Sequence, residues 1–191
     1  MLKLEDLADI YTGLPSRETE DGDARFLRLS DVTELAQGKT PILARGELSE
    51  VGRALPIQPC DIVVGARGSA TDVCGADERV IGAYISLELY LLRPDTQKIH
   101  PSYLRTVLRL PTIQAALRAQ KQGTGLTRIP KDALAQLEIP LPALKTQRKI
   151  ADLSDLVEEE ERLLARLANR KAIYHREILS RVVQTAMRTS P

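Results

Sequence analysis

The sequence from residue 139 to residue 183 is IPLPALKTQRKIADLSDLVEEEERLLARLANRKAIYHREILSRVV. From Thr146 onward the chain has no glycine, and it has no proline until the final Pro191. Alanine, leucine, glutamate and arginine, which are abundant here, all favour helix. The composition predicts one long helix over residues 145–191. At about 1.5 Å per residue, a helix of about 40 residues would be ~60 Å long.

Apolar residues recur along this helix with a period near 3.5, which is the period of a coiled coil. Glu160 and Lys171 interrupt the stripe. A helix of this length cannot bury its whole stripe against one small domain, so it needs another helix. The sequence therefore predicts a coiled coil, and a homodimer is the simplest way to form one. The expected contact residues are Ile150, Leu153, Leu156, Leu164, Leu167, Tyr174 and Ile178.

The charges on the helix indicate how two copies would pair. Four consecutive acids at residues 158–161 precede a basic segment from Arg162 to Lys171, and both lie near the middle of the helix. An antiparallel pair sets the acids of one copy against the bases of the other, whereas a parallel pair places like charges together. We therefore expect an antiparallel dimer.

Residues 1–144 alternate between short strand and helix patterns, which predicts a globular α+β domain. The Gly65–Gly68 turn follows a β-branched run and displays Arg67, and it fits a ligand-facing turn and an ordinary hairpin equally well. The expected elements are a short helix over 2–10, a strand over 26–29, a strand ending at 64, one or two strands within 80–93, two helices within 101–122 divided at Pro111, and a short helix or turn leading into a strand near 139.

Charge is distributed unevenly along the chain. The net charge is only +1, but residues 96–131 contain seven basic residues and no acid. Arginines outnumber lysines 19 to 8, and the planar guanidinium suits phosphates and guanine edges. A one-signed segment of this kind is typical of a protein that binds the DNA backbone. A basic helix face that is merely solvated is an equally good interpretation of this feature alone.

Several classes of protein are not expected. No apolar run approaches the roughly 20 residues of a membrane helix, and the first ten residues carry acids where a signal peptide is apolar, so we expect a cytoplasmic protein with no membrane contact. Cys60 and Cys74 stand far apart with only two histidines in the chain, so no metal site is expected. No cofactor motif is present, since the GARG turn lacks the lysine and hydroxyl residue that end a phosphate-binding loop.

Five segments, in order along nearly the whole chain, resemble the specificity (S) subunit of type I restriction–modification systems. They are LEDLADIYTGLPS, FLRLSDV, LPIQPCDIVVGARGS, IHPSYLRTVLRLP and GTGLTRIPKDALAQLEIPLPALKTQRKIA. The most telling feature is the phrase Ile-Pro-Leu-Pro…Gln…Ile, here Ile139 to Ile150, which in that family ends a target-recognition domain and begins a spacer helix. A full-length S subunit has two recognition domains and two spacers, whereas this chain has one of each. Thr146 also stands where the family often has glutamate.

The resemblance implies a non-catalytic DNA-recognition subunit. Residues 1–144 would read a half-site in double-stranded DNA, and residues 145–191 would form the spacer. The implied partners are DNA methyltransferase subunits, with a restriction or translocase subunit as a further possibility. Arg128 would contact guanine, with Lys121, Thr124 and Thr127 lining the groove. The residues expected to position the DNA backbone are Arg28, Arg67, Arg105, Arg109 and Arg118.

Catalysis by this chain is not expected. Ser86, Asp95 and His100 could be drawn as a triad, but no glycine-flanked nucleophile turn surrounds any serine. Neither a nuclease-like acidic cluster nor a methyltransferase motif occurs. Two other interpretations stay open: a protein-interaction adapter whose helix pairs with a partner, and a specificity domain detached from a methyltransferase.

Overall fold

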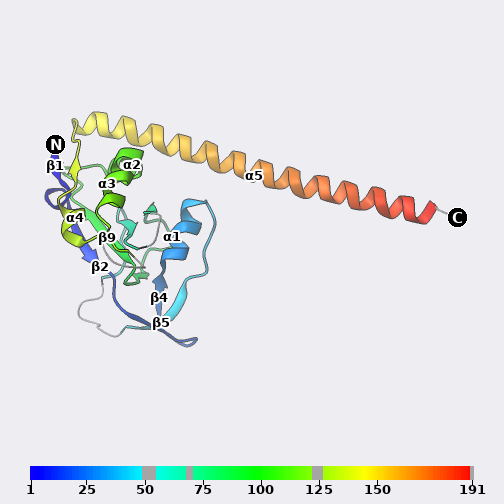
Figure 1. The fold of residues 1–191 in the computed structure, drawn as a ribbon, viewed down its shortest axis with the longest axis horizontal. Helices are drawn as coiled ribbons and strands as arrows, with labels where there is room; N and C mark the ends of the chain where they lie inside the picture. The colour runs from blue at the N-terminus through cyan, green and yellow to red at the C-terminus, as the bar shows by residue number, and fades with distance from the viewer. Residues whose placement is uncertain (49–54, 68–70, 122–126, 190–191) are drawn as a thin grey trace. The chain divides into compact units, whose positions relative to one another are not determined.

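A computed structural model of the chain describes residues 1–48, 55–67, 71–121 and 127–189. The chain divides into two compact units, Met1–Ser154 and Asp155–Pro191. The first unit combines strands with short helices, and the second is helical over its described residues (Figure 1). The predicted α+β class with a long C-terminal helix is therefore confirmed. No described helix is both long and apolar enough to cross a membrane.

The centre of the first unit is an antiparallel sheet. Its described strands lie in the order β2 (Ala8–Thr12), β9 (Leu89–Pro94), β6 (Ile62–Gly65) and β7 (Val73–Gly75). Alternate residues of a strand point to opposite faces. Val64 and Leu92 accordingly belong to one buried cluster, whereas Val63 and Leu91 belong to another. Because both faces are covered, every residue of β6 is buried.

A second sheet lies on one side of this centre. Its described strands lie in the order β3 (Ser16–Glu18), β5 (Ala44–Leu48), β4 (Ala24–Leu27) and β8 (Tyr84–Ile85). The β4–β8 pair is parallel, and the other pairs are antiparallel. Helix α1 (Leu29–Ala36) follows β4 directly, and its Val32 packs in the same cluster as Val63.

The other cluster is covered by the helices that follow β9. Helices α2 (Pro101–Arg109) and α3 (Pro111–Ala119) each begin with a proline, whose fixed φ and missing N–H suit the first helical position. The predicted division at Pro111 is therefore confirmed. The short helix predicted after Pro130 is α4 (Lys131–Ala135), and it leads into β10 (Glu138–Ile139), which pairs with β1 (Leu2–Lys3).

One local prediction is wrong, and the bounds of another are shifted. The helix expected over residues 2–10 is instead β1, a 3₁₀ turn at Leu4–Asp6 and strand β2. The spacing correctly indicated the buried residues, which are Leu4, Leu7 and Ile10. The backbone is nevertheless extended, because β1 pairs with β10 and β2 pairs with β9, and this pairing outweighs the local helix propensity. The strand expected over 26–29 ends at Leu27, because the Asp31 carboxylate accepts the Arg28 backbone N–H at 2.8 Å and starts α1.

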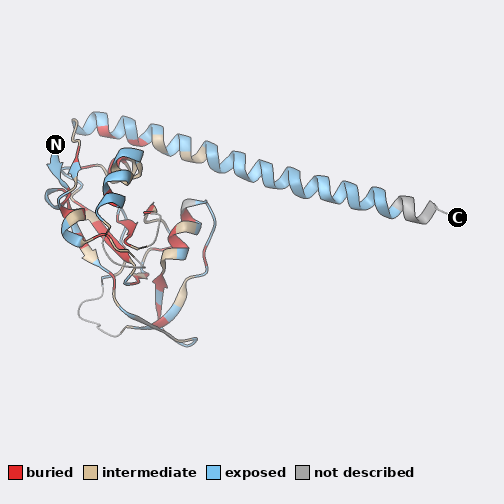
Figure 2. Cartoon of the chain, viewed as in Figure 1, coloured by how far each residue is buried: buried red, intermediate tan, exposed pale blue. Residues whose placement is uncertain are grey.

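The long helix is α5 (Leu144–Thr189). Its first turns belong to the first unit, where Gln147 and Ala151 are buried. The part in the second unit is exposed along almost its whole described length (Figure 2). The apolar stripe is therefore uncovered in a single chain: Leu156 is 68% exposed and Tyr174 is 62% exposed.

Candidate nucleic-acid interface

The arginines of α2 lie along β7, which is one of the two outer strands of the first sheet among the described residues. Residues of an antiparallel strand alternate between facing the partner strand and facing away. The Asp72 carbonyl accepts the Gly65 N–H at 2.8 Å, so the carbonyl of Val73 faces away from β6. Arg109 donates to that carbonyl oxygen from Nε at 2.9 Å and from Nη2 at 2.7 Å. Its guanidinium therefore caps the open edge of the sheet.

Arg105 lies one helical turn before Arg109 and reaches the other end of the same strand. A Cβ added at Gly75 would lie 3.1 Å from Arg105 Nη1, so the absence of a side chain at Gly75 leaves room for the guanidinium. Arg105 also lines a pocket of about 240 Å³ with His100 and Ser102 from the start of α2. Both arginines of α2 therefore lie alongside β7.

Lys121 continues this row beyond the end of α3. Burial and the positive charge of Arg118 lower the pKa of Lys121, and the carboxylate of Asp72 opposes the shift. Asp72 also accepts a hydrogen bond of 2.5 Å from the Thr33 hydroxyl of α1. Asp72, just before β7, therefore contacts helix α1 and lies within electrostatic range of Lys121. We call Arg105, Arg109, Arg118 and Lys121 the edge row.

Arg128 lies beside Arg67 at the end of β6. The two residues form an antiparallel β-bridge, and the Ile129 N–H donates to the Ala66 carbonyl at 2.9 Å. The guanidinium of Arg128 stacks 5.0 Å from the ring centroid of Tyr90, and its Nε lies 3.3 Å from the Tyr90 hydroxyl. We call Arg67 and Arg128 the arginine bridge. It joins the GARG turn to the glycine loop that was predicted to line DNA.

Other predicted contact residues lie elsewhere or are not described. Arg28 lies at the start of α1, and its Nε is 3.5 Å from Asp31. Thr127 is half-buried next to Arg128, whereas Thr124 lies outside the described residues. Of the seven cations between residues 96 and 131, Lys98 pairs with Asp95 at 3.2 Å and also donates to the Asp6 carbonyl.

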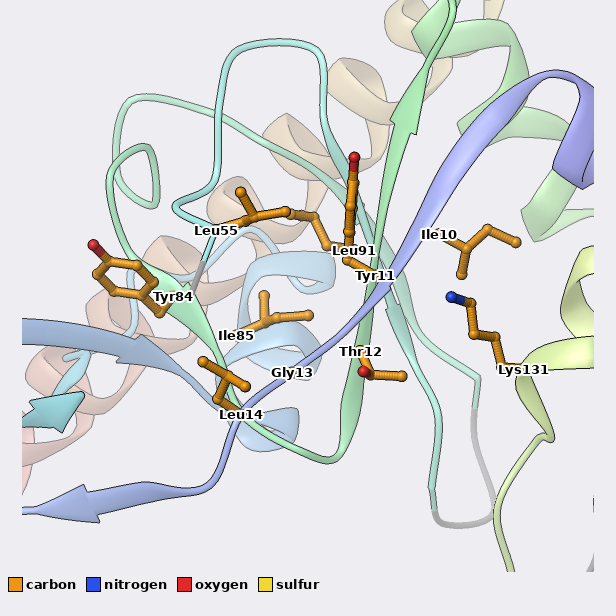
Figure 3. A pocket seen from close by; sticks show the side chains of 10 residues that line it. All are labelled: Ile10, Tyr11, Thr12, Gly13, Leu14, Leu55, Tyr84, Ile85, Leu91 and Lys131. Carbon is orange, nitrogen blue, oxygen red and sulfur yellow. The ribbon is translucent and has the colours of Figure 1, made fainter. Parts of the chain in front are cut away.

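The last of the seven cations, Lys131, belongs to the opposite edge of the sheet. It lines a pocket of about 260 Å³ with Ile10 and Thr12 of β2, and the other lining residues are mostly apolar (Figure 3). Strands β2 and β7 are the two outer strands of the described sheet. The basic segment of the sequence is therefore not one continuous surface. Arg105 and Arg109 lie along β7, Lys121 lies within electrostatic range of Asp72 just before it, and Arg128 lies at the end of β6, whereas Lys98 and Lys131 lie elsewhere.

Comparison with known proteins assigns the chain to a family. Residues 2–169 match the model of the type I restriction modification DNA specificity domain. This chain belongs to that family. No curated protein sequence matches it.

Solved structures share the fold of this specificity domain. A type I restriction–modification S subunit from M. genitalium aligns over 83% of this chain with a TM-score of 0.59 and 17% sequence identity. The HsdS subunit from Thermoanaerobacter tengcongensis aligns over 86% of this chain with a TM-score of 0.58 and 21% sequence identity. A chain from a structure of a type I R-M system, described for its complex assembly and conformational transition, aligns over 97% of this chain with a TM-score of 0.65 and 19% sequence identity. The chain spans only 38% to 44% of the length of these proteins.

The segments that carried the resemblance to the specificity family hold the fold together. Gly13 allows a close approach, since an added Cβ would lie 2.0 Å from the Ser86 carbonyl oxygen. Asp61 is 1% exposed and accepts from Arg93 Nε at 2.9 Å and Nη2 at 2.8 Å. Gln147 is 1% exposed and joins α5 to the start of α2. The sequence indicated the family through these segments but assigned no role to these residues.

The described residues of the specificity domain show how the side chains weighed for metal binding and catalysis are held. They contain no cluster of three or more histidine, cysteine or acidic side chains that could hold a metal. Burial raises the pKa of the Cys74 thiol to about 12, so this thiol is no nucleophile at neutral pH. Asp95 accepts the Gln97 N–H and pairs with Lys98, and no hydrogen bond links it with Ser86 or His100 in the described part of the chain.

Proposed function

We propose that this specificity domain binds double-stranded DNA sequence-specifically and reads one half of an interrupted target site. The observation that carries the proposal is that cations from α2, from just after α3 and from the turns at residues 67 and 128 lie along β7 and at the adjoining end of β6. The edge row comes from α2, from α3 and from Lys121 just after α3. The arginine bridge comes from the turns at residues 67 and 128. Clustered cations of this kind suit a phosphate backbone.

The proposed division of roles follows from how each cation is held. Arg109 donates twice to the Val73 carbonyl, so it holds the sheet edge and adds charge. Arg118 and Lys121 lie at the end of α3 and would contact phosphates. Arg128 is held against Tyr90 and would contact a base. Thr127, and Thr124 in the undescribed part of the loop, would add hydrogen bonds that adapt to the groove.

The test is DNA affinity measured against salt. Fluorescence anisotropy with a pool of random duplexes should give a steep fall in affinity with salt. Changing Arg118, Lys121 and Arg128 to glutamate should weaken binding and flatten the slope of log affinity against log salt by about 0.9 for each phosphate that the variant no longer neutralises.

The matched control changes Lys145, Arg148 and Lys149 to glutamate. These residues are exposed on the first turns of α5, and the control variant has the same net charge as the test variant. Equal weakening in both variants would contradict the proposed interface, and no binding by the wild type would contradict the function.

We further propose that two copies pair through α5 as an antiparallel coiled coil. Two copies would then supply the two recognition domains and two spacers that a full-length S subunit carries in one chain. The support is the exposed apolar stripe of α5 and the acidic and basic segments at its middle, where Arg162 pairs with Glu159. Twofold symmetry would make the target an interrupted palindrome.

The far part of α5 offers a second apolar patch, which supports docking of methyltransferase subunits. Leu179 and Val183 are 64% and 55% exposed, and each directly follows a residue of the stripe, Ile178 or Val182. Neighbouring residues of a helix point about 100° apart, so a partner helix centred on the stripe would cover Leu179 and Val183 only at its margin. Leu179→Glu with Val183→Glu should keep the dimer but abolish co-purification with a cognate methyltransferase subunit. Loss of the dimer as well would contradict a separate docking face. A restriction or translocase subunit is a further proposed partner of the assembly.

A further inference from the structure

The arginine bridge places two guanidinium groups side by side from segments that are far apart in the chain. Arg67 and Arg128 are directly opposite in an antiparallel bridge. Side chains opposite one another in such a bridge leave the same face, with Cβ atoms roughly 4.5–5.5 Å apart. Two like charges in this position repel each other, so this pair works against the stability of the fold. Among the described residues, neither arginine forms an ion pair with a carboxylate.

The backbone and a buried tyrosine fix the orientation of Arg128. Tyr90 is 1% exposed, and its hydroxyl donates to the Ile129 carbonyl at 2.7 Å. The Arg128 Nε donates to the same hydroxyl, and the guanidinium lies against the ring. The two Nη groups, which carry four of the five N–H donors of an arginine, are left for a ligand.

Arg67 presents a buried donor for which the described part of the chain supplies no acceptor. Its Nε is buried and has no hydrogen-bond partner among the described residues. A buried donor without an acceptor is unfavourable, so the stability of the fold does not explain why this guanidinium is held here. Because the side chain is half-buried, it can reach a ligand only through its outer Nη donors, and a ligand of both arginines would carry several hydrogen-bond acceptors close together.

We infer that Arg67 and Arg128 together form one site that recognises guanine. The half-site would then contain guanines at adjacent base pairs, each contacted by one arginine through O6 and N7 in the major groove. This inference rests on the proposed function and extends it, because it moves Arg67 from backbone positioning to base recognition. A guanine edge suits the bridge better than a phosphate does. The fork of arginine matches O6 and N7 with two parallel hydrogen bonds, and a half-buried guanidinium of fixed orientation favours such directional contacts over diffuse charge attraction.

The experiment first selects preferred duplexes from a random pool with the wild-type chain. Arg67→Lys and Arg128→Lys then keep the charge but remove the fork. Each should lower affinity for the selected duplex about tenfold and weaken the guanine preference at one base pair, because an ammonium can still donate to O6 or N7 but without the planar fork. Replacing that guanine by 7-deazaguanine, which lacks N7, should weaken the wild type similarly and the matching lysine variant less. Arg118→Lys is the matched control and should keep the preference at every position.

Wild-type protein gives an independent readout in case a variant fails to fold. Methylation of guanine N7 by dimethyl sulfate should be blocked at the two adjacent guanines in the complex. A selected consensus without guanine, or lysine variants that weaken all duplexes equally with the consensus intact, would overturn the inference while leaving the DNA-binding function standing. A wild type that selects no sequence would overturn both.

Discussion

The side-chain carbonyl of Gln147 accepts a hydrogen bond of 2.8 Å from the backbone N–H of His100. The amide group of Gln147 also donates to the Pro142 carbonyl at 2.9 Å. His100 immediately precedes α2, and Gln147 lies in the first turns of α5. One buried side chain therefore joins the start of the long helix to the helix that carries Arg105 and Arg109. These hydrogen bonds give a physical reason for the glutamine in the phrase that begins the spacer helix.

We expect Gln147→Ala to lower the free energy of unfolding by about 1–3 kcal/mol, because it leaves the partly buried His100 N–H and Pro142 carbonyl without their partner. Urea unfolding followed by circular dichroism measures the change. The matched control is Gln136→Ala, whose amide donates to Glu5 at the surface and should cost less than about 0.5 kcal/mol. Equal destabilisation of the two variants would show that the buried amide has no special role.

The family and its broad architecture could be predicted from the sequence because the signals are local. Glycine, proline and the 3.5-residue stripe each act within a few positions, and Pro111 and the glycine-free helix were placed correctly for this reason. The same motifs hold the fold. Asp61 and Gln147 stand in segments that resemble the family, yet each acts through a partner that is distant in sequence, Arg93 or His100.

The arrangement of the candidate site could not be predicted in this way. The seven cations of residues 96–131 are contiguous in sequence, but folding sends Lys131 to the edge formed by β2 and Arg109 to the edge formed by β7. Arg67 and Arg128 come together only because the Ile129 N–H pairs with the Ala66 carbonyl. The prediction of a helix at residues 2–10 is wrong for the same reason, since strand pairing with distant residues determines the backbone conformation of that segment.

The buried pair of Asp61 and Arg93 gives a second stability prediction. Asp61→Asn should cost about 3–5 kcal/mol, because it leaves the Arg93 guanidinium partly buried without its anion. Asp77→Asn is the matched control. Asp77 pairs with Arg79 at the surface, where such pairs contribute about 0–1 kcal/mol. Thermal unfolding of both variants beside the wild type makes the comparison, and a destabilisation below about 1 kcal/mol for Asp61→Asn would contradict a structural role for the pair.

The two cysteines should differ sharply in reactivity. Cys60 is exposed, whereas Cys74 is buried and its pKa is raised by burial from 9.0 to about 12. A thiol-specific chromogenic reagent at pH 8 should therefore label one thiol in the native chain and two in urea. Because the folded-state pKa is raised, the stability that the protonated Cys74 contributes is complete below about pH 9 and is lost as the pH rises toward 12. Cys74→Ala should flatten that alkaline decline, and rapid native labelling of both thiols would contradict the burial of Cys74.

The dimer prediction rests on the exposed stripe of α5. Leaving its leucine and isoleucine side chains in water would cost roughly 1.5–3 kcal/mol each relative to burial. Leu164→Glu with Leu167→Glu should therefore convert a dimer to a monomer in sedimentation at tens of micromolar. The matched control is Asn169→Glu, since a residue two positions after Leu167 lies on nearly the opposite side of the helix. A wild type that is monomeric at this concentration, alone and with the methyltransferase, would contradict the dimer.

The direction of the helices can be tested separately from their association. If the acids at residues 158–161 of one copy face the basic segment from Arg162 to Lys171 of the other, the stripe residue Leu153 approaches Tyr174 of the partner copy. In a Cys60→Ser background, a mixture of Leu153→Cys and Tyr174→Cys chains should therefore form a mixed disulfide under mild oxidation. The same charges make this arrangement weaken with salt, whereas a parallel pair would strengthen as its like charges are screened. Efficient crosslinking of Leu153→Cys chains to one another would keep the dimer but reverse its direction, and the two recognition domains would then lie at the same end of the paired helices.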